Sequence, residues 1–322
     1  MEQTLRRIVE TYWDIHMKEF FSIRNADKKI AEIKDARGNV YIVKGEKNDC
    51  QKVNEICEFA NVLRAILPVP AYIQTVHSAY AIEQGGLTYT LEQKVTGIEA
   101  KFVTDRQLYV IGKALGKMHR FSLEHSLRLH QATAWSMFGG NKTDRIGDYD
   151  ENELSFVDFE NAFYDEPLHS EIKALYMKHR DKLEKNWPAL PMAATQGDFC
   201  PYNMLFDDTG NIAGIFDFNL AGDEVLVNEC IAVGVYVSWH IEYEGELDPA
   251  ERFEQFIAGY TEERAFTDLE IKVIPSLFSI IRAFRYDRVD AGIEDGANKT
   301  AFMEETLNLL KDCGGVVLIN KQ

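Results

Sequence analysis

Apolar residues recur at helical spacing in long segments of the chain. In each segment the apolar positions fall three or four residues apart, which places them on one face of a helix. The segment 49–67 stops before Pro68, because proline ends a helix and restrains the residue before it. The pattern predicts helices over residues 5–20, 49–67, 105–121, 168–185, 231–239, 253–260, 268–289 and 297–311.

Shorter apolar runs, bounded by turn-forming residues, indicate strands. They fall over residues 20–23, 29–34, 40–43, 72–76, 79–83, 88–95, 204–206 and 212–218. Most of them lie near the N-terminus, whereas the rest of the chain is mainly helical. We therefore expect an α+β protein with two parts: a small lobe with an antiparallel sheet, residues 1–95, and a larger helical lobe, residues 96–322.

The last two strands predict a hairpin that brings polar side chains together. Its turn lies at Gly210, and Asn203 and Asp217 are equally distant from this glycine along the sequence. An antiparallel pair then places Asn203 opposite Asp217, with Cβ atoms about 5 Å apart. An amide and a carboxylate suit Mg²⁺, which takes few protein ligands. Asp198, on the loop before the hairpin, is then in a position to accept a proton from a hydroxyl group.

The sequence around this hairpin has a specific pattern over residues 197–218: Gly-Asp-x-x-x-x-Asn-x-Leu-Phe, a turn, and Gly-x-x-Asp-Phe. It resembles the aminoglycoside phosphotransferase family, which includes aminoglycoside, choline and homoserine kinases. The resemblance extends over most of residues 20–230 and implies a bilobal protein-kinase-like fold. It also implies that Asp198 is the catalytic base and that Asn203 and Asp217 hold Mg²⁺.

The resemblance assigns nucleotide-binding residues to the N-terminal lobe. The apolar strand 41–44 ends in Lys44, like the kinase strand whose lysine contacts the α- and β-phosphates of ATP. In kinases the helix that follows carries a glutamate that pairs with this lysine. Here Glu55 is the expected partner of Lys44, and Glu58 is the alternative.

The strand 88–95 resembles the family's strand that runs into the hinge between the lobes. By that resemblance, adenine meets backbone groups near Gln93, Lys94 and Val95. ATP and Mg²⁺ are thus the expected cofactors, and a small molecule with a hydroxyl group is the expected substrate.

These features predict a kinase that transfers the γ-phosphoryl group of ATP to an amino alcohol, a homoserine-like amino acid, a sugar or an aminoglycoside. However, Gln196 stands where the family usually has His, and the turn 25–28 over the phosphates has no glycine. One alternative is therefore a pseudokinase that binds nucleotide without turnover. A second is an unrelated α/β protein with a chance arrangement of Asp, Asn and Asp. A protein kinase is disfavoured, because no Ala-Pro-Glu segment follows Asp217.

Composition narrows the functional classes. The chain of 322 residues carries a formal net charge of −17, which disfavours nucleic-acid binding. We find no apolar run as long as a membrane span and no apolar signal segment near Met1. The five cysteines lack Cys-x-x-Cys spacing and are expected to be reduced thiols. We expect a cytoplasmic protein that binds neither nucleic acid nor membrane, and its oligomeric state stays open.

Several ionisable residues outside the hairpin have a structural or a functional interpretation. His119 is expected to be a core or capping residue rather than a ligand, and Asp223 to orient the catalytic loop. Arg282, Arg285 and Arg288 recur every three residues along one predicted helix. They could grip an anionic group of the substrate, or they could pair with neighbouring carboxylates.

Overall fold

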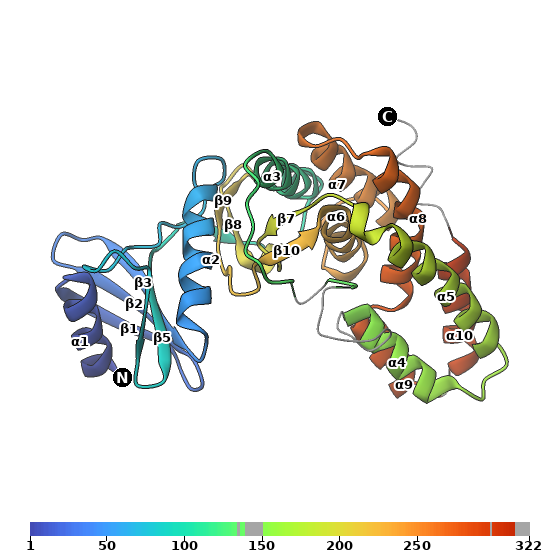
Figure 1. Cartoon of the computed structure of the whole chain (residues 1–322), viewed down its shortest axis with the longest axis horizontal. Helices are drawn as coiled ribbons and strands as arrows, with labels where there is room; N and C mark the ends of the chain where they lie inside the picture. Colours follow the sequence, from blue (N-terminus) through green and yellow to red (C-terminus); the bar gives the residue numbers. More distant parts are fainter. Residues whose placement is uncertain (134–135, 139–150, 297, 313–322) are drawn as a thin grey trace. The chain divides into compact units, whose positions relative to one another are not determined.

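The computed structural model of the chain describes residues 1–133, 136–138, 151–296 and 298–312 (Figure 1). These residues form two compact units. The first unit contains residues 1–100 and 202–221, and the second contains the described residues of 101–201 and 222–322. A single division at residue 95 differs from this grouping, because the predicted hairpin returns to the first unit.

The first unit is organised around an antiparallel sheet with the strand order β1-β2-β3-β5-β4. The strands are β1 (Met17–Asn25), β2 (Lys29–Asp35), β3 (Val40–Glu46), β4 (Ala81–Gln84) and β5 (Leu87–Gln93). Each strand pairs with its neighbour in antiparallel register, and β3 and β5 lie side by side in the sheet although α2 and β4 separate them in sequence.

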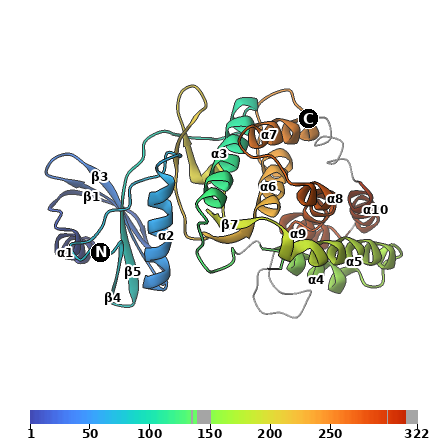
Figure 2. The ribbon, with the colours of Figure 1, turned by 45° about the horizontal axis from the view of Figure 1, so that its top comes forward.

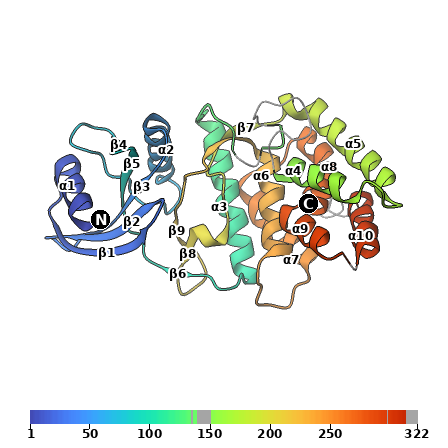
Figure 3. The same cartoon turned by 90° about the horizontal axis from the view of Figure 1, so that it is seen from below.

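Two helices cover opposite faces of this sheet, α1 (Glu2–Trp13) and α2 (Cys50–Leu63) (Figures 1 and 3). Asp49 begins α2, where its carboxylate accepts a hydrogen bond from the backbone N–H of Lys52. Such a cap satisfies one of the N–H groups that have no partner inside the helix. The central strands of the sheet are therefore covered on both faces, whereas most of β1 is exposed.

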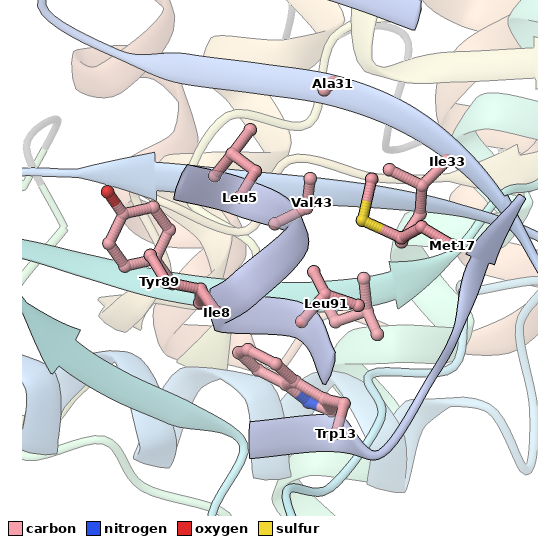
Figure 4. Packing of buried hydrophobic residues seen from close by; sticks show 10 residues of the cluster. Leu5, Ile8, Trp13, Met17, Ala31, Ile33, Val43, Tyr89 and Leu91 are labelled. Atoms are coloured by element: carbon pink, nitrogen blue, oxygen red, sulfur yellow. The ribbon is translucent and has the colours of Figure 1, made fainter. Parts of the chain in front are cut away.

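The hydrophobic core of the first unit lies between α1 and the sheet. Figure 4 shows Leu5 and Ile8 of α1 together with Val43 of β3 and Leu91 of β5, all of them buried. Successive side chains of a strand point to opposite faces. The residues that follow Val43 and Leu91, which are Lys44 and Glu92, therefore face the α2 side of the sheet.

A small sheet with the order β6-β8-β9 completes the first unit. Its strands are β6 (Ile98–Glu99), β8 (Met204–Phe206) and β9 (Ile212–Ile215). Strands β8 and β9 form the predicted hairpin. It is tied to the rest of this unit by the N–H of Ile215, which donates to the carbonyl of Pro68 at 2.9 Å, and by the edge-on ring contact of Phe59 with Phe218.

The second unit is mainly helical. Its main elements are α3 (Asp105–Glu124), α4 (Glu151–Phe163), α5 (His169–Asn186), β7 (Met192–Thr195), β10 (Gly222–Val225), α6 (Leu226–Val235), α7 (Pro249–Glu263), α8 (Asp268–Ala283), α9 (Tyr286–Glu294) and α10 (Lys299–Lys311). Short helical turns lie at Trp187–Ala189 and Tyr236–His240. Capping boxes begin α3, α7 and α8, as their sequences allow. Strands β7 and β10 pair antiparallel.

Helices α3 and α7 pack closely side by side (Figure 2). A Cβ atom on Gly112 of α3 would collide with the carbonyl of Phe256, and one on Gly259 of α7 would collide with the carbonyl of Tyr109. Glycine is required at both positions because the two backbones approach each other without intervening side chains. The predicted α+β class is confirmed, with a five-stranded antiparallel sheet in one unit and a larger helical unit.

Three predicted elements differ from the structure. The helix predicted over 5–20 ends at Trp13, where Asp14 adopts a left-handed φ of 53°, and the chain continues as β1. The helix predicted over 268–289 is divided into α8 and α9 by Arg285, whose backbone is extended.

Residues 72–76 do not form the regular strand that the sequence predicts. Instead, the N–H of Ile73 donates to the carbonyl of Leu91 and the N–H of Gln93 donates to the carbonyl of Ala71, both at 2.8 Å. Residues 71–73 therefore run beside β5. The polar, glycine-containing segment 131–153, which its sequence marks as a loop, lies largely outside the described residues.

The sequence predicts no membrane-spanning segment. In the described ranges, we find no helix with the length and apolar character needed to cross a bilayer.

Candidate active site

The end of the β8–β9 hairpin positions Asn203 and Asp217 in the first unit. The N–H of Phe216 donates to the carbonyl of Asn203 at 3.0 Å, so Asn203 lies opposite Phe216. The predicted direct opposition of Asn203 and Asp217 is therefore wrong by one residue. The cause is the turn, which is centred on Thr209 rather than Gly210, because the N–H of Asp207 donates to the carbonyl of Asn211. An irregularity at Ala213, between the pairs of Leu205 and Phe206, recovers one of the two residues of offset.

Asp217 lies immediately after the paired part of the hairpin, in a strained backbone conformation. Its φ of 58° is left-handed, which is uncommon for a residue other than glycine. Asp217 is half-buried, as is Asn203. The buried ring of Phe218 and the hydrogen bond from Ile215 to Pro68 fix the chain on both sides of it. Such strain at a defined carboxylate is a common feature of functional sites.

Lys44, at the α2 side of β3, forms an ion pair with Glu92 of β5. The distance from Lys44 Nζ to Glu92 Oε1 is 3.0 Å, and the two side chains are 17% and 5% exposed. Burial by itself lowers the pKa of Lys44, but the negative charges of Glu92 and Asp217 outweigh burial and raise it above its ordinary value. Lys44 and Asn219, which follows Asp217 by two residues, line one small cavity of the first unit. We call Lys44 and Glu92 the strand pair.

The predicted pairing of Lys44 with Glu55 on α2 is wrong. Glu55 is exposed and accepts a hydrogen bond from the side chain of Gln51 at 3.2 Å. Glu58, the alternative, is also exposed. The reason lies in the helical period: the buried face of α2 presents Cys57 to the sheet, and the two glutamates lie outside that face.

The predicted adenine-contacting segment follows Glu92 directly. The N–H of Gln93 donates to Ala71 and the N–H of Lys94 donates to the carbonyl of Val40 at 3.0 Å. Both amides are thus used within the first unit. Val95 is partly buried, and a Cβ atom on Gly214 would contact its side chain at 2.9 Å. The expectation of a backbone contact to a nucleotide base therefore stays a prediction, for the carbonyl of Gln93 and the backbone of Val95.

Asp198 lies in the second unit, on the loop that follows β7. Its N–H donates to Oε1 of Gln196 at 2.8 Å, and its carbonyl accepts from the N–H of Cys200 at 2.8 Å. Gly197, between them, has a left-handed φ of 81°, a conformation that favours glycine. Gln196 is fully buried. The residue that departs from the family's usual His therefore fixes the backbone of Asp198 directly.

Behind this loop lies a chain of buried polar groups, here called the buried network: Gly197, Glu229, His119, Tyr260 and Arg264. Glu229 accepts from the N–H of Gly197 at 3.3 Å and contacts Nε2 of His119 at 2.7 Å. The other ring nitrogen of His119, Nδ1, lies 2.9 Å from the hydroxyl of Tyr260. That hydroxyl accepts from Arg264 at 2.9 Å.

The hydrogen-bond directions of the buried network follow from its donors. Arg264 only donates, so the O–H of Tyr260 points to Nδ1 of His119, and the ring proton lies on Nε2, facing Glu229. Burial lowers the pKa of His119, although Glu229 opposes this effect, and the ring is therefore neutral at neutral pH. His119 is a core residue, as expected.

The remaining charged residues have structural partners. The carboxylate of Asp223 accepts from the N–H groups of Leu129 and His130, at 2.8 and 3.1 Å. Asp223 thus anchors the segment after α3 beside β10, and an orienting effect on the catalytic loop stays a prediction. The three arginines pair with carboxylates, as the second interpretation predicts: Arg282 with Asp312 at 3.3 Å, Arg285 with Asp287 at 2.9 Å and Arg288 with Glu305 at 3.1 Å.

The donor groups of the hairpin end fit Mg²⁺ in kind. Asn203 and Asp217 present an amide and a carboxylate at adjoining positions of one ladder, and hard oxygen donors of this number are typical of Mg²⁺ sites that keep several waters. Over the described ranges, we find no cluster of three or more His, Cys, Asp or Glu side chains that could hold a metal ion. The site is therefore unlike the closed thiolate or imidazole sites of structural metals.

The sequence is similar to a known enzyme family and to a curated relative. The family described as "Phosphotransferase enzyme family" matches residues 41–266. A homoserine kinase of Gluconacetobacter diazotrophicus is 36% identical over 94 residues, which are 28% of this chain and 28% of that protein. The match thus spans just over a quarter of the relative's length.

Solved structures with a similar fold are also kinases. The amicoumacin kinase hAmiN, solved in complex with AMP-PNP, Ca²⁺ and Ami, has a TM-score of 0.63 at 15% identity, over 98% of this chain and 94% of its own. An aminoglycoside phosphotransferase of Alicyclobacillus acidocaldarius has a TM-score of 0.59 at 13% identity, over 93% of each chain. A microcompartment-associated aminopropanol kinase has a TM-score of 0.57 at 13% identity, over 99% and 97%.

Proposed function

Because the chain belongs to the phosphotransferase enzyme family, we propose that it transfers the γ-phosphoryl group of ATP to the hydroxyl group of a small molecule. The family and the enzyme class expected from the sequence are thereby confirmed. One observation carries the rest of the proposal: Lys44 and Asn219, which follows Asp217 by two residues, line one small cavity of the first unit. The negative charge of Asp217 also helps to raise the pKa of Lys44. Phosphoryl transfer needs such a cation and such a carboxylate around the phosphates.

The predicted residues other than Glu55 take the following roles in this reaction. Lys44 contacts the phosphates of ATP, and Asn203 and Asp217 hold Mg²⁺. When bound, Mg²⁺ supplies positive charge to the phosphate oxygens. Asp198 accepts the proton of the substrate hydroxyl as its oxygen forms the new bond to phosphorus, while the bond to the ADP oxygen breaks. The adenine base contacts backbone groups of Gln93 and Val95.

The acceptor class is inferred from the relatives and from the charge of the chain. The relatives named above act on homoserine, aminopropanol, amicoumacin or aminoglycosides, according to their names. The chain's net charge of −17 is compatible with a cationic substrate. We therefore propose a small hydroxyl compound, and the panel to be tested is homoserine, aminopropanol, a sugar and an aminoglycoside.

The test is the variant Asp198→Asn, assayed by ADP release with this panel. We expect turnover to fall about 10²–10⁴-fold, because a general base is removed, while ATP affinity is retained. Asp208→Asn is the matched control, since Asp208 is an exposed carboxylate at the turn of the same hairpin. Equal turnover in Asp198→Asn and Asp208→Asn would contradict the assignment of the base. Nucleotide binding without turnover of any acceptor by the unaltered protein would favour the pseudokinase.

A further inference from the structure

The carboxylate that pairs with Lys44 lies on a strand. In protein kinases the corresponding lysine pairs with a glutamate on the helix that follows it, and movement of that helix controls the pair. Here the partner is Glu92, at 3.0 Å and almost fully buried. The lysine and its partner therefore belong to neighbouring strands of one sheet.

Helix α2 offers no carboxylate to Lys44. Its buried face brings Cys57 next to Lys44, and both residues line one small cavity. Burial and the charge of Glu92 raise the pKa of Cys57, so the thiol is neutral and cannot balance the lysine. Glu55 and Glu58 point to solvent. Helix α2, all of which the structure describes, thus lacks the carboxylate that pairs with this lysine in protein kinases.

The register of the sheet sets the position of Glu92. Lys44 lies opposite Thr90, and Ile42 lies opposite Glu92, so Lys44 and Glu92 are diagonal neighbours on one face. Long side chains reach each other across such a diagonal.

The other side of Glu92 is also fixed. Tyr72 bridges to Glu92 through the backbone, and the hydrogen bonds of Ile73 and Gln93 flank this bridge. Tyr72 is buried, and burial together with the charge of Glu92 raises its pKa well above the ordinary value. Glu92 is therefore held between β3 and residues 71–73, in a place that depends on backbone pairing.

We propose that Glu92 is the positioning residue that holds Lys44 for the nucleotide phosphates, in place of a carboxylate on α2, so that this ion pair stays assembled whatever the position of α2. The proposal rests on the nucleotide-binding role of Lys44 in the proposed function. It adds a residue that the sequence pattern did not indicate. It also removes one means of regulation, because a shift of α2 cannot separate two residues of adjacent strands.

The test is a double-mutant cycle with Glu92→Gln, Lys44→Met and the variant with both changes. The readouts are the affinity for MgADP by calorimetry, and the KM for ATP and kcat. We expect Glu92→Gln to weaken MgADP binding and raise the KM for ATP about tenfold, the scale on which a supporting partner acts. In the Lys44→Met background it should cause no further loss, because Glu92 acts through the lysine. The acceptor KM should not change.

Glu55→Gln is the matched control and should bind MgADP like the unaltered protein. If Glu92→Gln binds MgADP as tightly as Glu55→Gln does, the proposal is overturned. It is also overturned if the losses of MgADP affinity in Glu92→Gln and Lys44→Met multiply in the double variant, because the two residues would then act independently. A lower melting temperature with unchanged affinity and KM would mark a merely structural role and also overturn it. MgADP binding with an intact cycle but no turnover would refute the proposed function and leave the role of Glu92 supported. Failure of the unaltered protein to bind MgADP would refute both.

Discussion

The strand pair and the buried network hold predicted catalytic residues in two different ways. In the strand pair, the register of β3 and β5 places Lys44 beside Glu92, and the two side chains need only to be present. In the buried network, the backbone of Gly197 is held by side chains, through Glu229 and His119. The strand pair depends on the register of the sheet, whereas the buried network depends on the direction of each hydrogen bond.

This difference has consequences for mutation. A strand register survives the loss of one side chain, since it is set by backbone pairs over many residues. A buried side-chain network does not, because each loss leaves a donor or acceptor without water or partner. We therefore expect changes in the buried network to reduce stability and turnover together. Changes in the strand pair should act on nucleotide binding, and on stability only where they leave a charge unpaired.

The largest effect is expected for Glu229→Ala. The change leaves the Nε2–H of His119 and the N–H of Gly197 without an acceptor, at a site where His119 is fully buried. Each lost acceptor costs about 1–3 kcal/mol, so the free energy of unfolding should fall by about 4 kcal/mol. Urea unfolding measures this, and turnover should fall at the same time because the backbone before Asp198 is released.

Two further variants sharpen the result. Glu229→Gln can accept from Gly197 but presents an N–H to His119, so the direction of the network is interrupted and part of the loss should persist. Glu254→Gln, on the exposed side of α7, should change stability by less than about 0.5 kcal/mol. A stable and active Glu229→Ala variant would show that the loop does not depend on the network.

A smaller effect is expected for Lys44→Met, which leaves the carboxylate of Glu92 buried without its cation. Removing one partner of a buried ion pair costs about 3 kcal/mol. The variant with both Lys44→Met and Glu92→Gln should recover much of this loss, because the unpaired charge is gone. Thermal and urea unfolding of the three proteins provide the measurement, and equal stability of the single and double variants would contradict it.

Local patterns in the sequence were sufficient to predict much of this architecture. The lysine at the end of an apolar strand, the helix before Pro68 and the hairpin around Gly210 each depend on neighbouring residues, and each is present. The exact register of the hairpin was not predictable, because the apolar pattern marks neither the centre of the turn at Thr209 nor the irregularity between Leu205 and Phe206.

The partner of Lys44 was missed for a different reason. The sequence shows which residues follow each other, and it favoured Glu55 because that residue lies on the next helix. Glu92 is brought to Lys44 by the pairing of β3 with β5, a contact between distant segments. One signal was available: Glu92 is a charged residue inside the apolar run 88–95, and a buried carboxylate in a strand needs a cation. His119 and Glu229 give no such signal, because their contact depends on how α3 and α6 pack.

Glu224 contrasts with Glu92: it is a buried carboxylate that forms no ion pair within the described part of the chain. It accepts from Thr133 at 2.5 Å and from the N–H of Val225 at 2.7 Å. Burial raises its pKa from the ordinary 4.5 to about 8. Between these values the folded protein binds more protons than the unfolded chain, so stability falls as the pH rises through this window.

We expect Glu224→Gln to stabilise the protein by about 2 kcal/mol at pH 6, because the cost of keeping the carboxyl group protonated is removed. The gain should vanish near pH 4, where the carboxyl group is protonated in both states. Urea unfolding at several pH values measures the difference between the two proteins. A constant difference across this range would show that Glu224 does not titrate with a raised pKa.

The smallest effect on stability is expected for Gln196→Leu, which removes the acceptor for the N–H of Asp198. The loss should be about 1 kcal/mol, with turnover reduced about tenfold because the catalytic carboxylate is less precisely held. Gln196→His is the informative partner, since a ring nitrogen can accept the same hydrogen bond. If Gln196 serves as the positioning residue of an active enzyme, the His variant keeps turnover while the Leu variant loses it. Equal turnover in both would mean that Asp198 is held by the buried network alone, and higher turnover in the His variant than in the unaltered protein would mean that Gln196 limits catalysis.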